Sequence, residues 1–479
     1  MLIAVKITKW VLTVLIAIFL TIYLVRAFDS RGMSELGPEY RIVFEHEFDA
    51  SQEEQTDWPA YLAIEKELAV ELEEKIDSET RPDSLVDRFS ADSLSSPNNY
   101  DANWNHSYEL SAASPRGVAV LLHGLTDSPY SMLSTAQVLA ASGYNVVVPR
   151  MPGHGFAIGG LLQARWEDWN AAVRVAVRRA MDRPGSDQSL LLVGYSNGGL
   201  LAIDYAFQCG DADDLPCPDG LVLLSPAIAV SPLAVVTNWH AAISWIPYFE
   251  KFAWFSILPE IDPFKFTSFP KRAAWEIYKM SKQLNTRLKD PVAAAGLPPI
   301  LTFQSAVDNT IDERAIITNL YERIPANGSE LVIYDVNRNS THLHLMKSRP
   351  GNPARYFESV APLKYGVIIL GNNDRYSRGV STSTLIAGRT SPVIRKTDLS
   401  WPRGVYSLSH IGIPFRADDV VYGDGSFGSD NDKRIAFGAM APRGEPGMLK
   451  LSSDYFLRMR YNPFFALQAE HIAAWVDGL

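Results

Sequence analysis

Short apolar runs alternate with amphipathic segments along most of the chain, and this pattern predicts an α/β fold. The segments between the runs have helical periodicity, as expected where crossover helices join parallel strands. Val367–Leu370 indicates a further strand, and Asn462-Pro463 precedes a closing helix over Phe464–Val476. From about residue 116 the pattern predicts a mostly parallel sheet covered by helices. The five runs that are typical of buried strands are 117–122, 189–193, 221–225, 299–304 and 331–336.

An apolar segment near the N-terminus predicts a membrane anchor. Lys6 and Lys9 precede the uncharged run Trp10–Val25. As a helix this run would be about 24 Å long, slightly short of a ~30 Å hydrocarbon core, although the flanking lysine side chains can extend to the membrane surface. A cleaved signal peptide is the alternative, but Val25-Arg26-Ala27 matches a cleavage site poorly. The run therefore favours a retained single-pass anchor within residues 1–31.

Residues 32–115 are expected to form a helical and loop extension that packs on a catalytic domain at 116–479. Pro59–Ile76 has the periodicity of an amphipathic helix, and we expect its acidic face to be solvated. Arg81–Asn103 is rich in Ser, Asp, Pro and Asn, which predicts a loop leading to the first strand of the sheet.

Candidate chemistry begins at Gly194-Tyr195-Ser196-Asn197-Gly198, which follows a buried-strand run and opens a helical stretch. In a Gly-x-Ser-x-Gly turn between strand and helix, the serine is exposed above the sheet, and the glycines leave room for the crossing backbone. Such a turn is a nucleophile elbow. An ordinary Gly-Ser turn is the alternative, but the position between strand and helix favours Ser196 as a nucleophile.

A serine hydroxyl near neutral pH needs a base, an orienting acid and donors for the developing oxyanion. His123 to Ser128 follow the strand run 117–122, where the backbone supplies one oxyanion donor in enzymes with such an elbow. The predicted donors are the N–H groups of Leu125 and Asn197. We expect His123 to brace this loop rather than to act as the base.

The acid and then the base are expected after the serine in the chain. Asp308 follows the fourth strand run and precedes a predicted helix at 311–324, which makes it the candidate acid; a helix N-cap is the alternative role. Two histidines are candidate bases. His342 follows the next strand run, whereas His410 comes much later, after the strand-like run Gly404–Ser409. Spacing alone favours His342.

Together these residues resemble the α/β-hydrolase superfamily, and within it the monoacylglycerol-lipase and lysophospholipase-like esterases of a bacterial group. The resemblance covers the chain from about residue 40 to the C-terminus. It implies an α/β-hydrolase fold and ester cleavage by a serine triad. In that group a Ser-His before an Ile-Pro-Phe-like stretch resembles the triad histidine, with an insertion between acid and base, which favours His410 over His342. The segments that carry the resemblance are 103–105, 123–130, 152–155, 166–169, 194–198, 262–266, 268–270 and 407–415.

A cap is predicted at about 228–298, where aromatic residues are dense. Most of them are expected to pack the cap onto the body. An aromatic-rich lid over a serine nonetheless favours a lipid-like or medium-chain acyl ester as substrate. Because the triad alone does not choose the acceptor, an acyltransferase or a serine peptidase is an alternative. A non-catalytic membrane-anchored scaffold is another, although the intact triad argues against it.

The net charge restricts the binding partners, and the two cysteines indicate the cellular compartment. The formal net charge of −10 argues against nucleic acid as a partner. Cys209 and Cys217, the two cysteines, flank a polar loop, which favours a disulfide in an oxidising compartment over two free thiols. Together with the anchor, this predicts a catalytic domain on the periplasmic or extracytoplasmic side of the inner (cytoplasmic) membrane. His342 and His344 have no third ligand nearby, so no metal site is predicted, and no cofactor motif occurs.

Overall fold

The centre of the molecule is a ten-stranded sheet with the order β1-β3-β2-β4-β5-β8-β9-β10-β11-β12. The computed structural model describes residues 2–76, 86–90, 93–187, 189–211, 215–229, 247–308, 313–347, 350–426, 434–445 and 448–479. Neighbouring strands from β3 to β10 are parallel, whereas β1, β11 and β12 pair in antiparallel fashion. The strands are β1 Tyr108–Leu110, β2 Gly117–Leu122, β3 Tyr144–Val148, β4 Leu190–Tyr195, β5 Gly220–Leu224, β8 Ile300–Ser305, β9 Glu330–Tyr334, β10 Gly366–Asn372, β11 Gly379–Leu385 and β12 Val393–Ser400.

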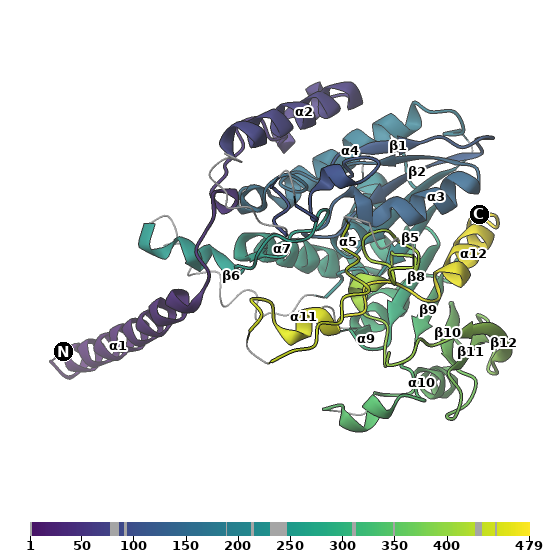
Figure 1. Ribbon diagram of the computed structural model, residues 1–479. Helices are drawn as coiled ribbons and strands as arrows, with labels where there is room; N and C mark the ends of the chain where they lie inside the picture. Colours follow the sequence, from purple (N-terminus) through teal and green to yellow (C-terminus); the bar gives the residue numbers. More distant parts are fainter. Residues whose placement is uncertain are drawn as a thin grey trace.

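Helices cover both faces of this sheet (Figure 1). This arrangement is the α/β-hydrolase fold and confirms the predicted fold class. The helices are α1 Leu2–Gly32, α2 Trp58–Lys75, α3 Leu133–Ala141, α4 Trp166–Met181, α5 Asn197–Asp211, α7 Lys271–Leu288, α8 Pro291–Ala295, α9 Glu313–Ile316, α10 Pro353–Val360, α11 Ser453–Leu457 and α12 Phe465–Val476. A short two-stranded sheet joins β6 (Trp254–Ser256) and β7 (Phe269–Pro270).

The central strands are buried on both faces because successive side chains point into different cores. Val118 and Val120 of β2 pack into a core with α4, α5 and α7. Ala119 and Leu121 pack into a second core with α3 and α12. This double burial explains why the strands are continuous apolar runs rather than alternating ones.

Two boundaries of the sheet differ from those expected from the sequence. The sheet begins before residue 116, because β1 pairs with β3. In the second half of the predicted cap, α7 packs into the same core as α5. Residues 230–246 of that cap lie outside the described residues. At the other edge, the predicted strand at Val367–Leu370 is β10, but the sheet continues through β11 and β12.

The segment before β1 packs on the body through both apolar and charged contacts. Phe48 and Tyr61 are buried in the core that contains α4 and α5. Glu47 accepts two hydrogen bonds from the fully buried Arg150, at 2.8 and 3.1 Å. The expectation of a solvated acidic face on α2 is wrong at Glu65, which is 1% exposed and accepts a hydrogen bond from the Ser107 backbone N–H at 2.9 Å.

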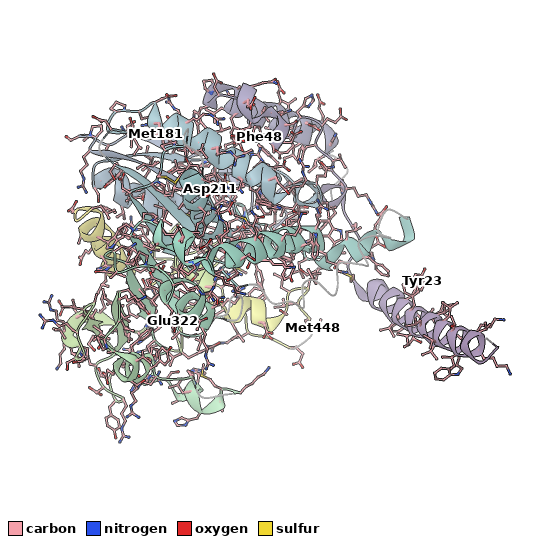
Figure 2. The ribbon with its side chains drawn as sticks, turned by 180° about the vertical axis from the view of Figure 1, so that it is seen from behind. Tyr23, Phe48, Met181, Asp211, Glu322 and Met448 are labelled. Carbon is pink, nitrogen blue, oxygen red and sulfur yellow. A yellow bond between two sulfur atoms is a disulfide. The ribbon has the colours of Figure 1, made fainter. Side chains whose placement is uncertain are left out.

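The N-terminal helix projects from the body (Figure 1). Its apolar stretch Val5–Val25 is not buried by the rest of the chain. This stretch is longer than the predicted Trp10–Val25 and, at 1.5 Å per residue, spans about 32 Å, enough to cross a bilayer by length and composition. In Figure 2, Tyr23 lies on this isolated helix, whereas Phe48 lies against the body. Because signal sequences have the same properties, the anchor stays a prediction.

The Glu47–Arg150 pair provides a test of how firmly the N-terminal segment is held. We expect Glu47→Gln to lower the free energy of unfolding by about 2 kcal/mol, because the buried guanidinium would lose its bidentate charged partner and keep only Glu65, 3.5 Å from its Nε. Chemical denaturation of the full chain in detergent measures this. Glu45→Gln is the matched control, since the Glu45 side chain is 76% exposed. Equal stability of the two variants would contradict the prediction.

Candidate active site

The turn between β4 and α5 has the geometry of a nucleophile elbow. Ser196 has a φ of +53°, a left-handed conformation that is uncommon for a residue with a side chain. A Cβ on Gly194 would lie 2.2 Å from the Gly198 carbonyl oxygen, and a Cβ on Gly198 would lie 1.9 Å from that of Leu122. Glycine is therefore required at both positions, because the neighbouring backbone lies too close for a side chain. Ser196 is partly exposed, whereas its neighbours in the chain are buried.

Hydrogen bonds to the backbone hold Ser196 in this strained position. Its N–H donates to the Leu224 carbonyl at 2.9 Å. Its carbonyl accepts from the N–H groups of Gly199 at 3.1 Å and Ala227 at 3.0 Å. A conformation of this kind costs about 1–3 kcal/mol and persists only where the surroundings determine it. Here the end of β5 and the first turn of α5 do so.

His410 and Asp308 are brought together although they lie 102 residues apart in sequence. A hydrogen bond of 2.9 Å joins His410 Nδ1 to Asp308 Oδ2. Gln304 Nε2 donates to the same carboxylate oxygen at 3.1 Å. Both side chains are buried, at 4% exposure for His410 and 0% for Asp308. A buried imidazole bonded through Nδ1 to a carboxylate has a fixed ring orientation, as the base of a serine triad requires.

The chain reaches His410 by returning to the ends of β8 and β9 after the excursion through β10, β11 and β12. Asn337, just after β9, donates from its backbone to the Tyr406 carbonyl at 2.8 Å and from its side chain to the Val405 carbonyl at 2.7 Å. Ser305, at the end of β8, donates to the Leu408 carbonyl at 2.8 Å. The returning segment was expected to be strand-like, but it is a loop held by these hydrogen bonds.

The competing histidine lies on the surface. His342 belongs to the short 3₁₀ helix η10 (Thr341–Leu345) and is exposed. Its Nδ1 bonds to Ser340 Oγ at 2.9 Å. The structure therefore pairs Asp308 with His410, not with the histidine that spacing alone favoured.

The predicted oxyanion loop is buried beside the elbow. Leu125 is 9% exposed and Asn197 is fully buried. Asn197 is the first residue of α5, so its backbone N–H has no acceptor within the helix and lies at the positive end of the helix dipole. The next residue of the loop, Thr126, has a φ of +66°, which is rare for a β-branched side chain.

His123 braces this loop, as expected. Its Nδ1 bonds to the Gly124 carbonyl at 2.9 Å, and its Nε2 accepts from the Met151 N–H at 2.9 Å. Burial lowers the pKa of His123 to about 3, so the ring is neutral at ordinary pH. Because both ring nitrogens are engaged in structural bonds, this side chain is not available as a base.

Four residues of the site were missed from the sequence. Gln304, Ser305 and Asn337 hold the acid and the returning loop, and Lys265 contacts the oxyanion loop. Gln304 and Ser305 are polar residues at the end of an otherwise apolar strand, a signal that could have indicated a site at that strand end. Lys265 lies in 262–266, one of the segments that carry the resemblance, which could have indicated it; Asn337 lies in a loop, where a polar residue carries no such signal.

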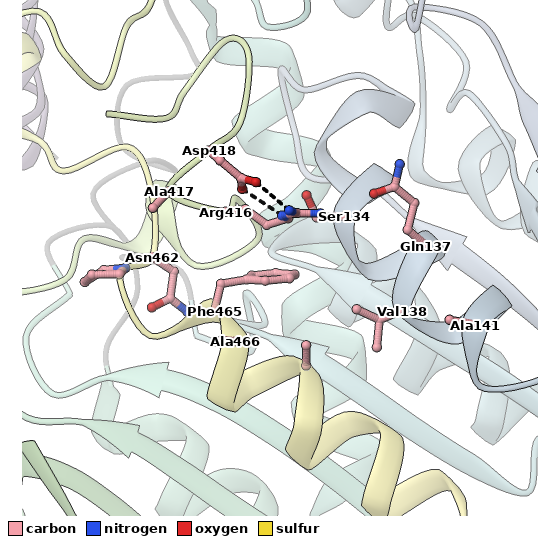
Figure 3. Close-up of a pocket in the computed structure, with 12 residues that line it drawn as sticks. Ser134, Gln137, Val138, Ala141, Arg416, Ala417, Asp418, Asn462, Phe465 and Ala466 are labelled. Atoms are coloured by element: carbon pink, nitrogen blue, oxygen red, sulfur yellow. Dashed lines mark hydrogen bonds and ion pairs between the residues drawn. The ribbon is translucent and has the colours of Figure 1, made fainter. Parts of the chain in front are cut away.

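A separate pocket lies between α3, α12 and the turn at 416–418 (Figure 3). Its volume is about 490 Å³. Its lining is largely apolar, with the Arg416–Asp418 ion pair at one side. None of Ser196, Asp308 and His410 lines this pocket. We therefore identify the candidate site from its hydrogen bonds and not from this cavity.

Comparisons with known proteins agree with this fold. Residues 113–255 match the Hydrolase_4 family model, described as serine aminopeptidase, S33, which confirms the predicted resemblance over this part. A thermostable monoacylglycerol lipase from Bacillus sp. (strain H-257) is 25% identical over 197 residues, covering 41% of this chain and 72% of that protein.

Solved structures with partial similarity include lipolytic enzymes. One comes from a study of LipS and LipT, two metagenome-derived lipolytic enzymes; it is 21% identical, covers 48% of this chain and 87% of its own, and has a TM-score of 0.40. The monoacylglycerol lipase of Paleococcus ferrophilus is 18% identical, covers 48% and 89% of the two chains, and has a TM-score of 0.37. Similarity at this level carries no information on activity.

The close contact at Gly198 provides a test of the elbow. We expect Gly198→Ala to reduce esterase activity at least about 100-fold, because the new Cβ would meet the Leu122 carbonyl and displace the nucleophile, and misplacements of about 1 Å can cost that much. Gly210→Ala, in the last turn of the same helix, is the control, since a Cβ there has no neighbour within 4 Å. Hydrolysis of p-nitrophenyl butyrate measures both. Similar activity in the two variants would exclude the elbow geometry.

Proposed function

We propose that the protein is a serine hydrolase that cleaves carboxylic esters with Ser196 as nucleophile, His410 as base and Asp308 as acid. The observation that carries this proposal is the buried hydrogen bond between His410 and Asp308. Two further observations support it: Ser196 has the strained backbone of an elbow, and the His410 ring lies 5.4 Å from the ring of Tyr195, the residue before Ser196. The 25% identity to a monoacylglycerol lipase over 197 residues adds support. Buried, oriented acid–base pairs next to a nucleophile are typical of acyl-transfer sites.

In the proposed mechanism, His410 takes the proton of the Ser196 hydroxyl as the oxygen attacks the ester carbonyl. Asp308 holds the imidazole in the required tautomer and stabilises the imidazolium. The backbone N–H groups of Leu125 and Asn197 donate to the oxyanion. His410 then protonates the leaving alcohol, which leaves an acyl-enzyme, and a water molecule repeats the sequence to release the carboxylic acid.

We propose a lipid-like or medium-chain acyl ester as the substrate. The relative from Bacillus is named a monoacylglycerol lipase, which supports this class. Residues 230–246 of the predicted cap lie outside the described residues. Among the described aromatic residues of the cap, Trp254, Phe264 and Phe266 are buried in the hydrophobic cores, as expected for packing residues.

For the cellular setting, we propose a single-pass anchor in the inner (cytoplasmic) membrane with the catalytic domain on the periplasmic or extracytoplasmic side. Two observations support it. The apolar part of α1 is not buried against the body. A disulfide joins Cys209 and Cys217, the pairing that the sequence favoured, and such bonds persist in oxidising compartments.

The identity of the base is tested by a pair of histidine variants. His410→Ala should lower kcat on a short p-nitrophenyl ester by about 10³-fold or more, because the serine loses its proton acceptor. His342→Ala should retain activity, since its ring is exposed on the surface. A fluorophosphonate probe should label the wild type and fail to label Ser196→Ala. A large loss in His342→Ala alone would overturn the assignment, and an unlabelled wild type would indicate a non-catalytic scaffold.

The substrate class is tested with an acyl-length series. We expect kcat/KM for p-nitrophenyl esters to rise from acetyl to octanoyl by about tenfold or more, because each added buried CH₂ contributes ~0.8 kcal/mol. Aminoacyl p-nitroanilides serve as the comparison, since the matched family is described as serine aminopeptidase. Faster turnover of the anilides, or equal turnover across acyl lengths, would contradict the lipid ester.

The proposed extracytoplasmic location of the catalytic domain is tested through the redox state of the two cysteines. We expect Cys209 and Cys217 of protein isolated from cell membranes to resist alkylation until a reductant is added, because an oxidising compartment preserves the bridge. Mass analysis of the alkylated peptides measures this. Alkylation of both thiols without reductant would contradict an extracytoplasmic catalytic domain.

A further inference from the structure

Lys265 lies in a segment, 262–266, that the proposed mechanism does not use. This segment runs beside the oxyanion loop and forms an isolated antiparallel bridge with it, between Asp127 and Lys265. The Phe266 N–H donates to the Thr126 carbonyl at 2.7 Å. Thr126 is the residue with the left-handed backbone, so this hydrogen bond holds the loop where its conformation is most strained.

An ion pair reinforces the backbone bridge. Lys265 Nζ lies 2.7 Å from Asp127 Oδ1. The Asp127 side chain is only 4% exposed and the Lys265 side chain 21%. The other carboxylate oxygen of Asp127 approaches Gly124 so closely that a Cβ on that glycine would lie 2.6 Å from it. The Asp127 carboxylate therefore lies directly against the backbone of the loop that contains Leu125.

The segment that carries Lys265 is itself anchored on the body. Asn105 Nδ2 donates to the Pro263 carbonyl at 2.9 Å. Phe264 stacks on Tyr130, with ring centroids 4.5 Å apart. Tyr422 donates its hydroxyl proton to Asp262 at 2.7 Å. These contacts fix the segment on the body and so hold Lys265 next to Asp127.

We propose that Lys265 is a positioning residue for the oxyanion hole, acting through Asp127 to hold the Leu125 N–H in the direction of the developing oxyanion. The lysine has a second effect. It neutralises a buried carboxylate close to the place where negative charge develops, and that carboxylate, if unpaired, would oppose the transition state. The inference rests on the proposed hydrolase function and adds a role that the triad does not contain.

The test uses the full chain in detergent and compares Lys265→Met with Lys279→Met. Lys279 pairs with the buried Glu276 at 2.6 Å on α7, so its variant also removes a lysine from a buried acid. For Lys265→Met we expect kcat on p-nitrophenyl butyrate to fall about 10- to 100-fold with KM nearly unchanged, since an oxyanion donor acts mainly in the transition state. Lys279→Met should keep the wild-type kcat.

A second set of variants distinguishes a positioning role of Lys265 from a role in folding. Lys265→Arg should restore most of the lost kcat. The double variant Asp127→Asn/Lys265→Met should be at least about threefold more active than Lys265→Met, because it leaves no unpaired buried charge. Should Lys265→Met not fold, Asp127→Asn alone should show a lowered kcat at similar KM, and the double variant should show no further loss, because Lys265 acts through Asp127. A wild-type kcat in Asp127→Asn, or a further loss in the double variant, would overturn this role.

The outcomes distinguish this inference from the proposed function. A wild type that neither labels with fluorophosphonate nor turns over esters would overturn both. An active wild type with an unchanged kcat in Lys265→Met would overturn the role of Lys265 alone. An equal loss in kcat and stability for Lys265→Met and Lys279→Met would indicate general destabilisation, and would also overturn it.

Discussion

The site depends on the close approach of two backbones where α5 begins. Gly198 passes so near the Leu122 carbonyl that no side chain fits between them. This contact sets the start of the helix against the end of β2, and the oxyanion loop continues directly from β2. The strain at Ser196 and the burial of Leu125 and Asn197 follow from the same crossing, because the proposed nucleophile and the proposed oxyanion donors are placed by one packing constraint.

The pairing of His410 with Asp308 shows that position in space, and not separation along the chain, decides which histidine meets the candidate acid. The exit of β9 is where a minimal fold would place its base, and His342 follows that exit in sequence. The chain instead leaves, builds β10 to β12, and comes back to Asn337 before reaching His410. The returning loop is therefore held at the ends of β8 and β9, where the acid also lies.

Much of the fold and the site could be predicted from local signals. Buried parallel strands are apolar on both faces, so their runs are visible, and the elbow has a short motif with a steric cause. The resemblance to a hydrolase family favoured His410 where spacing did not. Other features depend on distant contacts. Glu65 on α2 looks solvated in sequence but bonds to the Ser107 backbone, and the packing of α7 against α5 has no local signal in the sequence. The contact between Lys265 and Asp127 is of the same kind, since it joins segments 138 residues apart.

The excursion between Asn337 and the base has a consequence for how such a chain can diversify. Both of its ends are fastened to the sheet by hydrogen bonds, and the entropic cost of closing a loop rises only by about 0.6 kcal/mol for each doubling of its length. Related sequences can therefore lengthen, shorten or redecorate the β11–β12 hairpin with little effect on the chemistry at its root. That edge is a place where the chain can gain new recognition surfaces while the contact between His410 and Asp308 is kept.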